Sequence, residues 1–355
     1  MATTAILNER ESNYGTLVSV VVPAFQAQNT IRNCISSIQA QSYRNLECII
    51  IIDGATDDTE KIAEFSRQND SRIKIIRQRN LGRSAARNNG IHHAHGDWIM
   101  FVDADDELDS DAIEKLMAGT KNRNIDIVYG NYRTLSGNGP ACSRQIGEFD
   151  ISILRKANLN FDNYDFGSCA YAFDNYNCRT CWAKLYSNKI LNKIAFPFPE
   201  DIRIGEDTCM NYQMLNMARH VTYVDLPVYL YNDNSDGTVR TWNAKDFSSI
   251  MSLSDYIRAM CAIDSTQRLN LMAFAARDYL GVFARAARYA RLKQCHEISK
   301  LAQKSCTDFI RESLPCYLGD RRTVRNFYNT LRIWLIKHDC FNAVFLLQRI
   351  GGVFK

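Results

Sequence analysis

The sequence predicts an α/β protein with a parallel sheet, followed by an all-helical C-terminal extension. Between residues 17 and 130, short runs of β-branched and other apolar residues alternate with segments whose apolar residues recur at helical spacing. The strand candidates are apolar apart from single polar residues, which is typical of strands that are covered on both faces. From Phe247 onward only helical spacing remains. The alternation in the first part favours a parallel sheet with right-handed crossovers.

The strands and helices of this first part can be assigned in chain order. The five apolar runs predicted as strands are Leu17–Val22, which stops at Pro23, then Leu46–Ile52, Ile73–Ile76, Trp98–Val102 and Ile125–Tyr129. The helices expected between them are Asn29–Ala40, a segment opened by Asp57 or Asp58, Leu81–His93 and Ser110–Ala118. Together these elements form one half, residues 17–130, of a domain that we expect to extend to residue 242.

The other half of this domain, residues 131–242, changes character. Asn160–Cys181 is rich in Asn, Asp, Tyr and Phe. It can be an irregular surface segment, or a polar and aromatic wall suited to sugar hydroxyls and sugar faces. A helix is expected to open after Gly205, and a strand is expected at Val221–Val224.

The two ends of the chain differ from the central domain. Residues 1–16 are polar without periodicity and are predicted to be a loose arm, whereas residues 243–355 are predicted to be helical. From Arg240 to the end, 19 Lys and Arg residues stand against 9 Asp and Glu, so this part carries a net charge of +10 and the rest of the chain −6. Basic residues beside amphipathic aromatic stripes can bind an anionic membrane face, or they can be a solvated helix face, which is the commoner case.

Cysteine usage and hydropathy indicate a cytoplasmic protein. The twelve cysteines are scattered, the N-terminus has no export signal, and no run approaches the roughly 20 apolar residues that cross a bilayer. The one CxxC, Cys178–Cys181, lacks a second ligand pair at zinc spacing. His92–His95 runs straight into Gly96, which favours a helix end over a metal site.

Groups that could contact a ligand follow three of the predicted strands. Their ends carry Pro23-Ala24-Phe25, Asp53-Gly54 and Asp103-Ala104-Asp105. Ligands of parallel α/β sheets bind outside the carboxyl ends of the strands, so these groups should line one edge. Alternation along an extended chain points Asp103 and Asp105 the same way, which suits a divalent cation that holds phosphate oxygens. The alternative for this acidic cluster, and for Asp106 in particular, is an N-cap of the next helix.

A second acidic group opens the helix after Gly205. Glu206 and Asp207 in its first turn are explained in part by the helix dipole and by capping. A carboxylate held ionised at that position can also act as a general base. The first strand is followed by neither a GxGxxG nor a P-loop lysine, which argues against a dehydrogenase and an ATPase.

Six motifs in order resemble the family 2 inverting glycosyltransferases of GT-A fold, in particular bacterial enzymes that build cell-surface polysaccharides. The matching stretches are Val20–Phe25, Ile52–Thr59, Asn80–Asn88, Gly96–Asp106, Trp182–Tyr186 and Gly205–Thr208. They cover roughly residues 17–242, and the helical tail matches no motif of the family. The resemblance implies a Rossmann-like nucleotide-sugar-binding sheet.

The resemblance also implies roles for individual residues. Those that would contact the donor nucleotide are Pro23, Ala24, Phe25, Asp53, Arg83, Asp103 and, more loosely, Arg240. Asp105 and Asp103 would hold Mn²⁺ or Mg²⁺, and Asp207 would be the catalytic base. The chain departs from the family at Ile52, where a second acid is frequent, and at Asn232, where a basic residue is frequent.

The function implied is metal-dependent, inverting transfer of a single hexosyl or N-acetylhexosaminyl group. The donor would be a UDP-sugar and the acceptor a hydroxyl of a glycan or of a lipid-diphosphate-linked oligosaccharide, with a β-linkage expected. The setting would be O-antigen or capsule synthesis at the inner face of the plasma membrane, through peripheral contact with anionic lipid and without nucleic acid. The alternatives are a sugar nucleotidyltransferase and a non-catalytic nucleotide-sugar-binding module.

Overall fold

The computed structural model describes residues 15–121, 125–136, 146–150, 180–233, 252–253 and 255–256. The chain divides into two compact units, one made of residues 1–151 and 171–235 and the other of residues 152–170 and 236–355. All helices and strands named below belong to the first unit. The predicted N-terminal arm, apart from its last two residues, and nearly all of the predicted C-terminal helical region lie outside the described residues.

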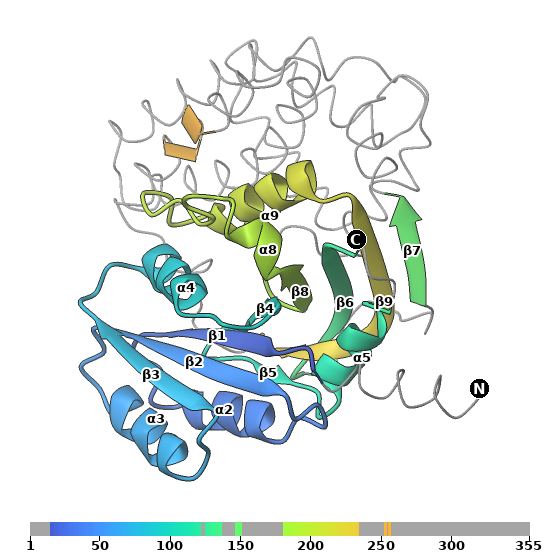
Figure 1. The fold of residues 1–355 in the computed structure, drawn as a ribbon. Helices are drawn as coiled ribbons and strands as arrows, with labels where there is room; N and C mark the ends of the chain where they lie inside the picture. Colours follow the sequence, from blue (N-terminus) through green and yellow to red (C-terminus); the bar gives the residue numbers. More distant parts are fainter. Residues whose placement is uncertain are drawn as a thin grey trace, which may run out of the picture. The chain divides into compact units, whose positions relative to one another are not determined.

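The first half of the domain has the predicted parallel sheet. Strands β1 (Val18–Ala24), β2 (Leu46–Asp53), β3 (Ile73–Gln78) and β4 (Trp98–Phe101) are parallel and lie in the order β3-β2-β1-β4 (Figure 1). Every residue of β2 and of β4 is buried, as their largely apolar runs predict. This arrangement brings the carboxyl ends of β2, β1 and β4 to the same edge of the sheet.

The second half continues the same sheet with mixed pairing. Strand β8 (Lys184–Ser187) pairs antiparallel with β4 and with β6 (Ile127–Thr134). Strand β9 (His220–Tyr231) pairs in parallel with β6, and antiparallel with β5 (Glu107–Leu108) and β7 (Ile146–Asp150). The described residues thus form one nine-stranded sheet.

Helices cover both faces of the parallel strands. α2 (Ile31–Gln39) and α3 (Thr59–Gln68) pack together on one face, and α4 (Arg83–His92) lies on the other against β1 and β2 (Figure 1). α5 (Ala112–Ala118) packs on β9 and β6. The short helix α8 (Asn188–Leu191) contacts α9 (Glu206–Met217). None of the described helices is long and apolar enough to cross a membrane.

Two strands run further than the sequence predicted. β1 passes through Pro23, where we expected it to stop, and ends at Ala24. The carbonyl oxygen of Val21 accepts from the N–H of Val102, so Val21 faces β4, and Pro23, two residues later, faces the same side. The pairing with β4 ends at Val21, so the strand loses no hydrogen bond because proline has no N–H. β9 is a single strand that includes Pro227, and its register against β6 shifts at Asn131.

Candidate active site

The Phe25–Gln28 loop after β1 is fastened to the loop after β2. Gln26, which has a φ of +49°, accepts the N–H of Thr56 at 2.8 Å. The N–H of Gln28 donates to Asp57, also across this gap. Phe25 is 49% exposed, so its ring is available for stacking on a ligand.

Of the neighbouring predicted contacts, Ala24 is buried and Pro23 half-buried. The side chain of Ala24 therefore cannot reach a ligand, and these two residues can contribute to a nucleotide site mainly through the backbone.

Asp53, at the end of β2, has a structural role that the sequence did not reveal. Its carboxylate accepts hydrogen bonds from Gln78 Nε2 at 2.8 Å, from the N–H of Leu81 at 2.8 Å and from the N–H of Gly82 at 2.9 Å. The side chain is only 3% exposed. Asp53 thus fixes the turn that leads into α4, and it would meet a nucleotide base with its oxygens already largely occupied.

Arg87, on α4, lies at the centre of the acidic groups. Its guanidinium is fully buried and donates to Asp103 Oδ1 at 2.7 Å and to Asp207 Oδ1 at 2.6 Å, and it lies 3.3 Å from Glu206 Oε1. Arg83, one helical turn earlier, pairs with Glu206. One arginine therefore joins the carboxylate after β4 to the one that opens α9.

The structure brings together the predicted residues Asp103, Asp207 and Arg83, which lie far apart in the sequence. It directs the Arg83 guanidinium to Glu206 rather than leaving it open at the edge of the sheet. The sequence reasoning missed Arg87. The available signal was its i, i+4 spacing from Arg83, which places two arginines on one helix face.

These contacts separate the pKa values of the two acids of α9. Burial alone would raise the pKa of Asp207, but Arg87, Arg83 and the N–H of Cys181 outweigh it and hold that pKa below its usual value. Burial raises the pKa of Glu206, although Arg83 opposes the shift. Asp207 is therefore the acid that stays ionised and can accept a proton.

Asp106 is neither a helix cap nor an exposed ligand. Its carboxylate accepts from the Tyr229 hydroxyl and from the N–H of Asn232, both at 2.7 Å. The same hydroxyl accepts the N–H of Asp103 at 3.1 Å. α5 begins later in the chain, with Asp111 as its N-cap residue, so the capping interpretation of Asp106 was wrong. Asp106 instead ties the turn after β4 to the end of β9.

The acidic turn suits a hard cation, although the protein supplies few ligands. Burial, the largest cause, together with the charges of Asp103 and Asp105, raises the pKa of Asp106 to about 8. Within the described ranges, no group of three or more His, Cys, Asp or Glu side chains is arranged to hold a metal. Mg²⁺ and Mn²⁺ sites that take most of their oxygens from phosphates and water need only one or two carboxylates. The half-buried Asp105, with Asp103, fits that requirement.

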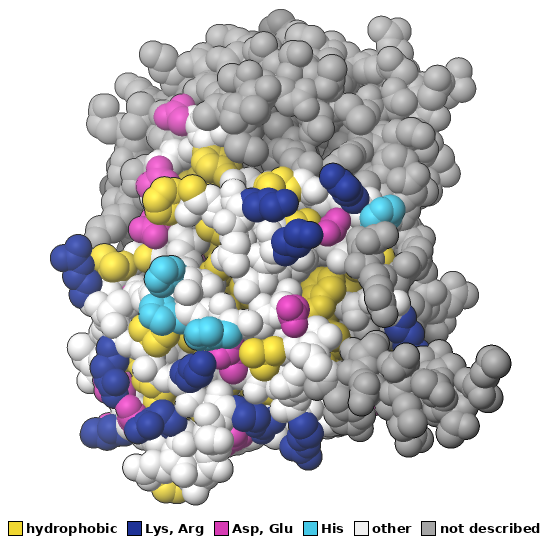
Figure 2. All heavy atoms as spheres, in the orientation of Figure 1, with side chains coloured by type: hydrophobic (Ala, Val, Ile, Leu, Met, Phe, Trp, Pro, Cys, Tyr) yellow, Lys and Arg dark blue, Asp and Glu magenta, His cyan; other side chains and the backbone are white. Residues whose placement is uncertain are grey.

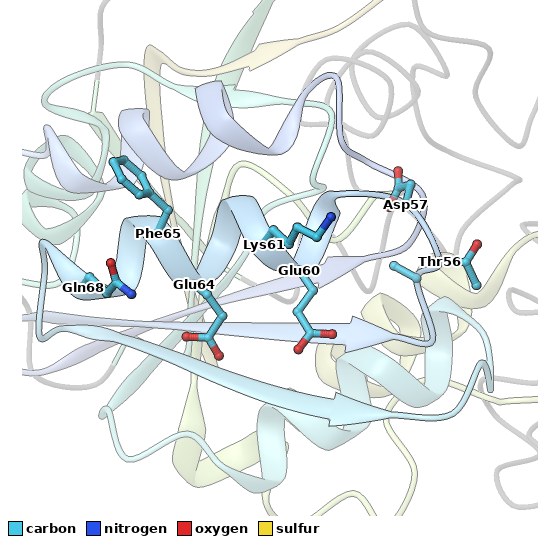
Figure 3. Close-up of a pocket in the computed structure, with 8 residues that line it drawn as sticks. Thr56, Asp57, Glu60, Lys61, Glu64, Phe65 and Gln68 are labelled. Carbon is cyan, nitrogen blue, oxygen red and sulfur yellow. The ribbon is translucent and has the colours of Figure 1, made fainter.

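A groove of about 600 Å³ lies away from this cluster. It is lined by Ala55–Asp57 and by the outer face of α3, including Glu60, Lys61, Glu64 and Phe65 (Figure 3). It includes none of the acidic residues around Arg87, although Thr56 and Asp57 belong to the loop after β2. Arg240 and most of the polar-aromatic stretch 160–181 lie outside the described residues, so their predicted roles stay predictions.

Comparisons with known proteins find glycosyltransferases among the relatives of this chain. A sequence model described as "Glycosyl transferase family 2" matches residues 19–192. Glycosyltransferase GlyA of Streptococcus pneumoniae is 29% identical over 64% of this chain and 32% of its own length. The Escherichia coli enzyme WfgD, a "UDP-Glc:alpha-D-GlcNAc-diphosphoundecaprenol beta-1,3-glucosyltransferase", is 30% identical over 51% of this chain and 64% of its own length. The chain thus spans less than two thirds of either relative.

Among solved structures, residues 1–349 of S. aureus TarS in complex with UDP-GlcNAc resemble this chain with a TM-score of 0.68. The superposition covers 94% of this chain and 92% of that one, at 16% sequence identity. At this identity the likeness concerns the fold, and it confirms the α/β class that the sequence predicted.

Proposed function

Because the chain belongs to glycosyl transferase family 2, we propose that it transfers one hexosyl or N-acetylhexosaminyl group from a UDP-sugar to a hydroxyl group, with inversion at the anomeric carbon. The observation that carries the proposal is the pairing of Asp103 and Asp207 through Arg87. This pairing supports the proposal because it joins the carboxylate that would bind the donor to the carboxylate that would act as the base.

The donor nucleotide would lie along the carboxyl ends of β1, β2 and β4. The exposed ring of Phe25 supports stacking against the base. Asp53 would contribute a remaining lone pair to the uracil N–H, and the turn that it fixes would approach the nucleotide through its backbone. Asp103 would face the ribose and Arg240 the diphosphate.

Asp105, together with Asp103, would hold Mn²⁺ or Mg²⁺ against the diphosphate. When bound, the ion neutralises charge that develops on the departing diphosphate oxygens. The protein's own contribution at this turn is positional, because Tyr229 holds both the Asp103 N–H and the Asp106 carboxylate. The carboxylates of this turn would thus be held in position for the diphosphate without having to reorganise.

Asp207 would act as the general base. Its carboxylate takes the proton of the acceptor hydroxyl as that oxygen attacks the anomeric carbon from the face opposite the diphosphate. The bond from the anomeric carbon to the diphosphate oxygen breaks, and UDP leaves with the electron pair. A single displacement of this kind converts an α-linked donor into a β-linked product. The lowered pKa of Asp207 keeps it ionised and ready to accept the proton.

The acceptor would be a glycan or a lipid-diphosphate-linked oligosaccharide used in surface polysaccharide synthesis. WfgD, a related protein, is named as a glucosyltransferase that acts on a diphosphoundecaprenol-linked sugar, and this similarity supports a lipid-linked acceptor. An acceptor of this kind resides in the membrane. We therefore propose that the protein works at the inner face of the plasma membrane in peripheral contact with anionic lipid.

The test is a transfer assay with the full chain, Mn²⁺, a panel of UDP-sugars and a synthetic polyprenyl-diphosphate-linked sugar. We expect one donor to give product, and Asp207→Asn to lower kcat by at least about a thousandfold, since the base is lost. Asp201→Asn removes the charge of an exposed carboxylate nearby and is the matched control. An Asp207→Asn variant as active as the wild type would exclude this base. Release of pyrophosphate from UTP and a sugar phosphate would favour the nucleotidyltransferase instead.

A further inference from the structure

The turn Thr180–Ala183, which leads into β8, contains the backbone group that contacts Asp207. We propose that Lys184 is a positioning residue that fixes this turn and thereby orients the catalytic base. The inference rests on the proposed role of Asp207 and extends it to a residue that does not touch the reacting atoms.

Lys184 is completely buried, which is unusual for an ammonium group. Its Nζ donates to the carbonyl oxygen of Thr180 at 2.6 Å and to that of Trp182 at 3.1 Å, and it lies 5.4 Å from the centre of the Tyr129 ring. A buried charge is tolerated only where hydrogen-bond acceptors are held around it. The ammonium and the two carbonyl groups therefore fix one another.

The same turn is fastened to the first turns of α9. The N–H of Cys181 donates to Asp207 Oδ2 at 3.2 Å, and the other oxygen of that carboxylate accepts from Arg87. Asn211 Nδ2 donates to the carbonyl oxygens of Thr180 and Asp207 at 2.8 and 3.0 Å. The rotation of the Asp207 carboxylate is thus set by Arg87 and by Cys181, which contributes its N–H and its thiol. The position of Cys181 depends on the turn.

The last two residues of the turn, Trp182 and Ala183, contact β9 and β6. Trp182 is 7% exposed and stacks on Tyr229, with ring centres 4.7 Å apart and an interplanar angle of 10°. The N–H of Gly130 donates to the carbonyl oxygen of Ala183 at 2.8 Å. Tyr229 also contacts Asp103 and Asp106, so we expect the acidic turn after β4 to keep its position when the backbone of Thr180–Ala183 changes.

The turn would not hold its shape unaided. Ala183 has a φ of +57°, in the left-handed region that residues with a side chain rarely adopt. Lys184 follows it directly and reaches back to the carbonyl groups on both sides of Cys181. Without the ammonium, the strained backbone can relax and turn the Cys181 N–H away from Asp207.

This geometry predicts a change in the titration of the base. The charged groups around Asp207 are Arg87 and Arg83 from α4 and the neighbouring Glu206 of α9, with Asp103 across Arg87. The turn itself adds the Cys181 thiol, whose pKa burial raises, so it stays protonated. The charged groups stay in place when Lys184 is replaced, so the contacts that are lost are the hydrogen bonds from Cys181. Since those bonds lower the pKa of Asp207, their loss raises that pKa and moves the acid limb of the pH–kcat profile to higher pH.

The experiment compares Lys184→Met with Lys189→Met, the same substitution at an exposed position. For Lys184→Met we expect kcat to fall about a hundredfold, as small displacements of a catalytic group do. UDP binding with Mn²⁺ should stay within threefold, and the amides of residues 180–183 should exchange with deuterium at least tenfold faster. Wild-type kcat, or wild-type exchange in the turn, would overturn the inference.

A second variant and a measurement that is independent of activity complete the test. If Lys184→Met does not fold, Asn211→Ala removes the other donor to Thr180 and should give a smaller change of the same kind in kcat and in exchange. If the wild type transfers no sugar from any donor, the proposed function fails. Deuterium exchange in the turn then still decides whether Lys184 fixes it.

Discussion

Arg87 is a single guanidinium that satisfies carboxylates from two distant parts of the chain. It is fully buried between Asp103 and Asp207, and Glu206 lies close by. A buried cation in this position cannot be removed without leaving uncompensated charge. Lysine cannot replace it, since one ammonium lacks the planar fork that reaches two carboxylates at once.

We therefore expect Arg87→Ala to lower the free energy of unfolding by about 3–5 kcal/mol. Arg87→Lys should lower it less but still reduce kcat. The measurement is denaturant unfolding of the full chain, with Arg44→Ala, an exposed arginine beyond the amino end of β2, as control. A loss of less than about 0.5 kcal/mol for Arg87→Ala would mean that the three acids do not need this charge.

Arg83 should control the pH dependence of transfer. It lowers the pKa of Asp207 from the ordinary value of 3.8, so wild-type Asp207 stays ionised as the pH falls towards that value. In Arg83→Gln this contribution is lost, the pKa rises, and activity that needs the ionised base disappears at a higher pH. Profiles of kcat from pH 4 to 8 should show the acid limb at higher pH in this variant than in the wild type, and an unmoved limb would contradict the assignment.

At the residue scale the sequence predicted the acids better than it predicted their partners. The spacing of Asp103 and Asp105 and the position of Asp207 at a helix start identified candidate groups. Their pairing with Arg87 depends on how α4 meets α9, which no local pattern encodes. The anchoring role of Asp106 was missed for the same reason, because Tyr229 lies more than a hundred residues further along the chain.

At the scale of elements, α4 packs unusually close to the sheet. A Cβ built on Gly90 would lie 2.2 Å from Val21 Cγ1 of β1, so the absence of a side chain lets the helix approach. This approach carries Arg83 and Arg87, on the same helix, to the carboxyl edge of the sheet.

Gly90→Ala should therefore destabilise the protein by about 1–3 kcal/mol, although alanine favours helix more than glycine does. Combining it with Val21→Ala should relieve the clash, so the double variant should be more stable than the sum of the two single losses. A double-mutant cycle by denaturant unfolding measures this coupling. Strict additivity would show that α4 moves outward freely.

The element boundaries show where periodicity was informative. The parallel strands and the helices between them were predicted to within a few residues, since each carries its own apolar pattern. Of β9 only Val221–Val224 was predicted, because Pro227 interrupts the pattern of the longer strand. β5, β7 and β8 were not predicted, because β5 has only two residues and because polar residues interrupt any apolar run in β7 and β8.

Across the whole molecule, Glu47 ties four strands together at the edge opposite the active site. It accepts from Ser19 of β1 at 2.6 Å, from Lys74 of β3 at 2.7 Å and from the N–H of His95, just before β4, at 2.7 Å. The exposed histidines at the end of α4 lie close together on this surface (Figure 2).

Glu47→Gln should lower stability by about 1–3 kcal/mol at pH 7, since it weakens charge-assisted hydrogen bonds to a buried group. Burial raises the pKa of Glu47, but Lys74, Ser19 and His95 outweigh it and bring the pKa below 4.5. The contribution is thus present above pH 4.5 and is lost as the pH falls through the lowered folded-state value. Unfolding curves of wild type and variant should converge in acid, and a constant difference would contradict this linkage.

The anchoring of Thr180–Ala183 has a consequence for changes in the stretch that precedes it. β7 is paired with β9 on one side of residues 151–179, and the turn held by Lys184 lies on the other. Both ends of this stretch are thus fixed to a common frame, and loop-closure entropy changes slowly with length. Changes in the length or sequence of this stretch are therefore expected to leave the turn that contacts Asp207 in place.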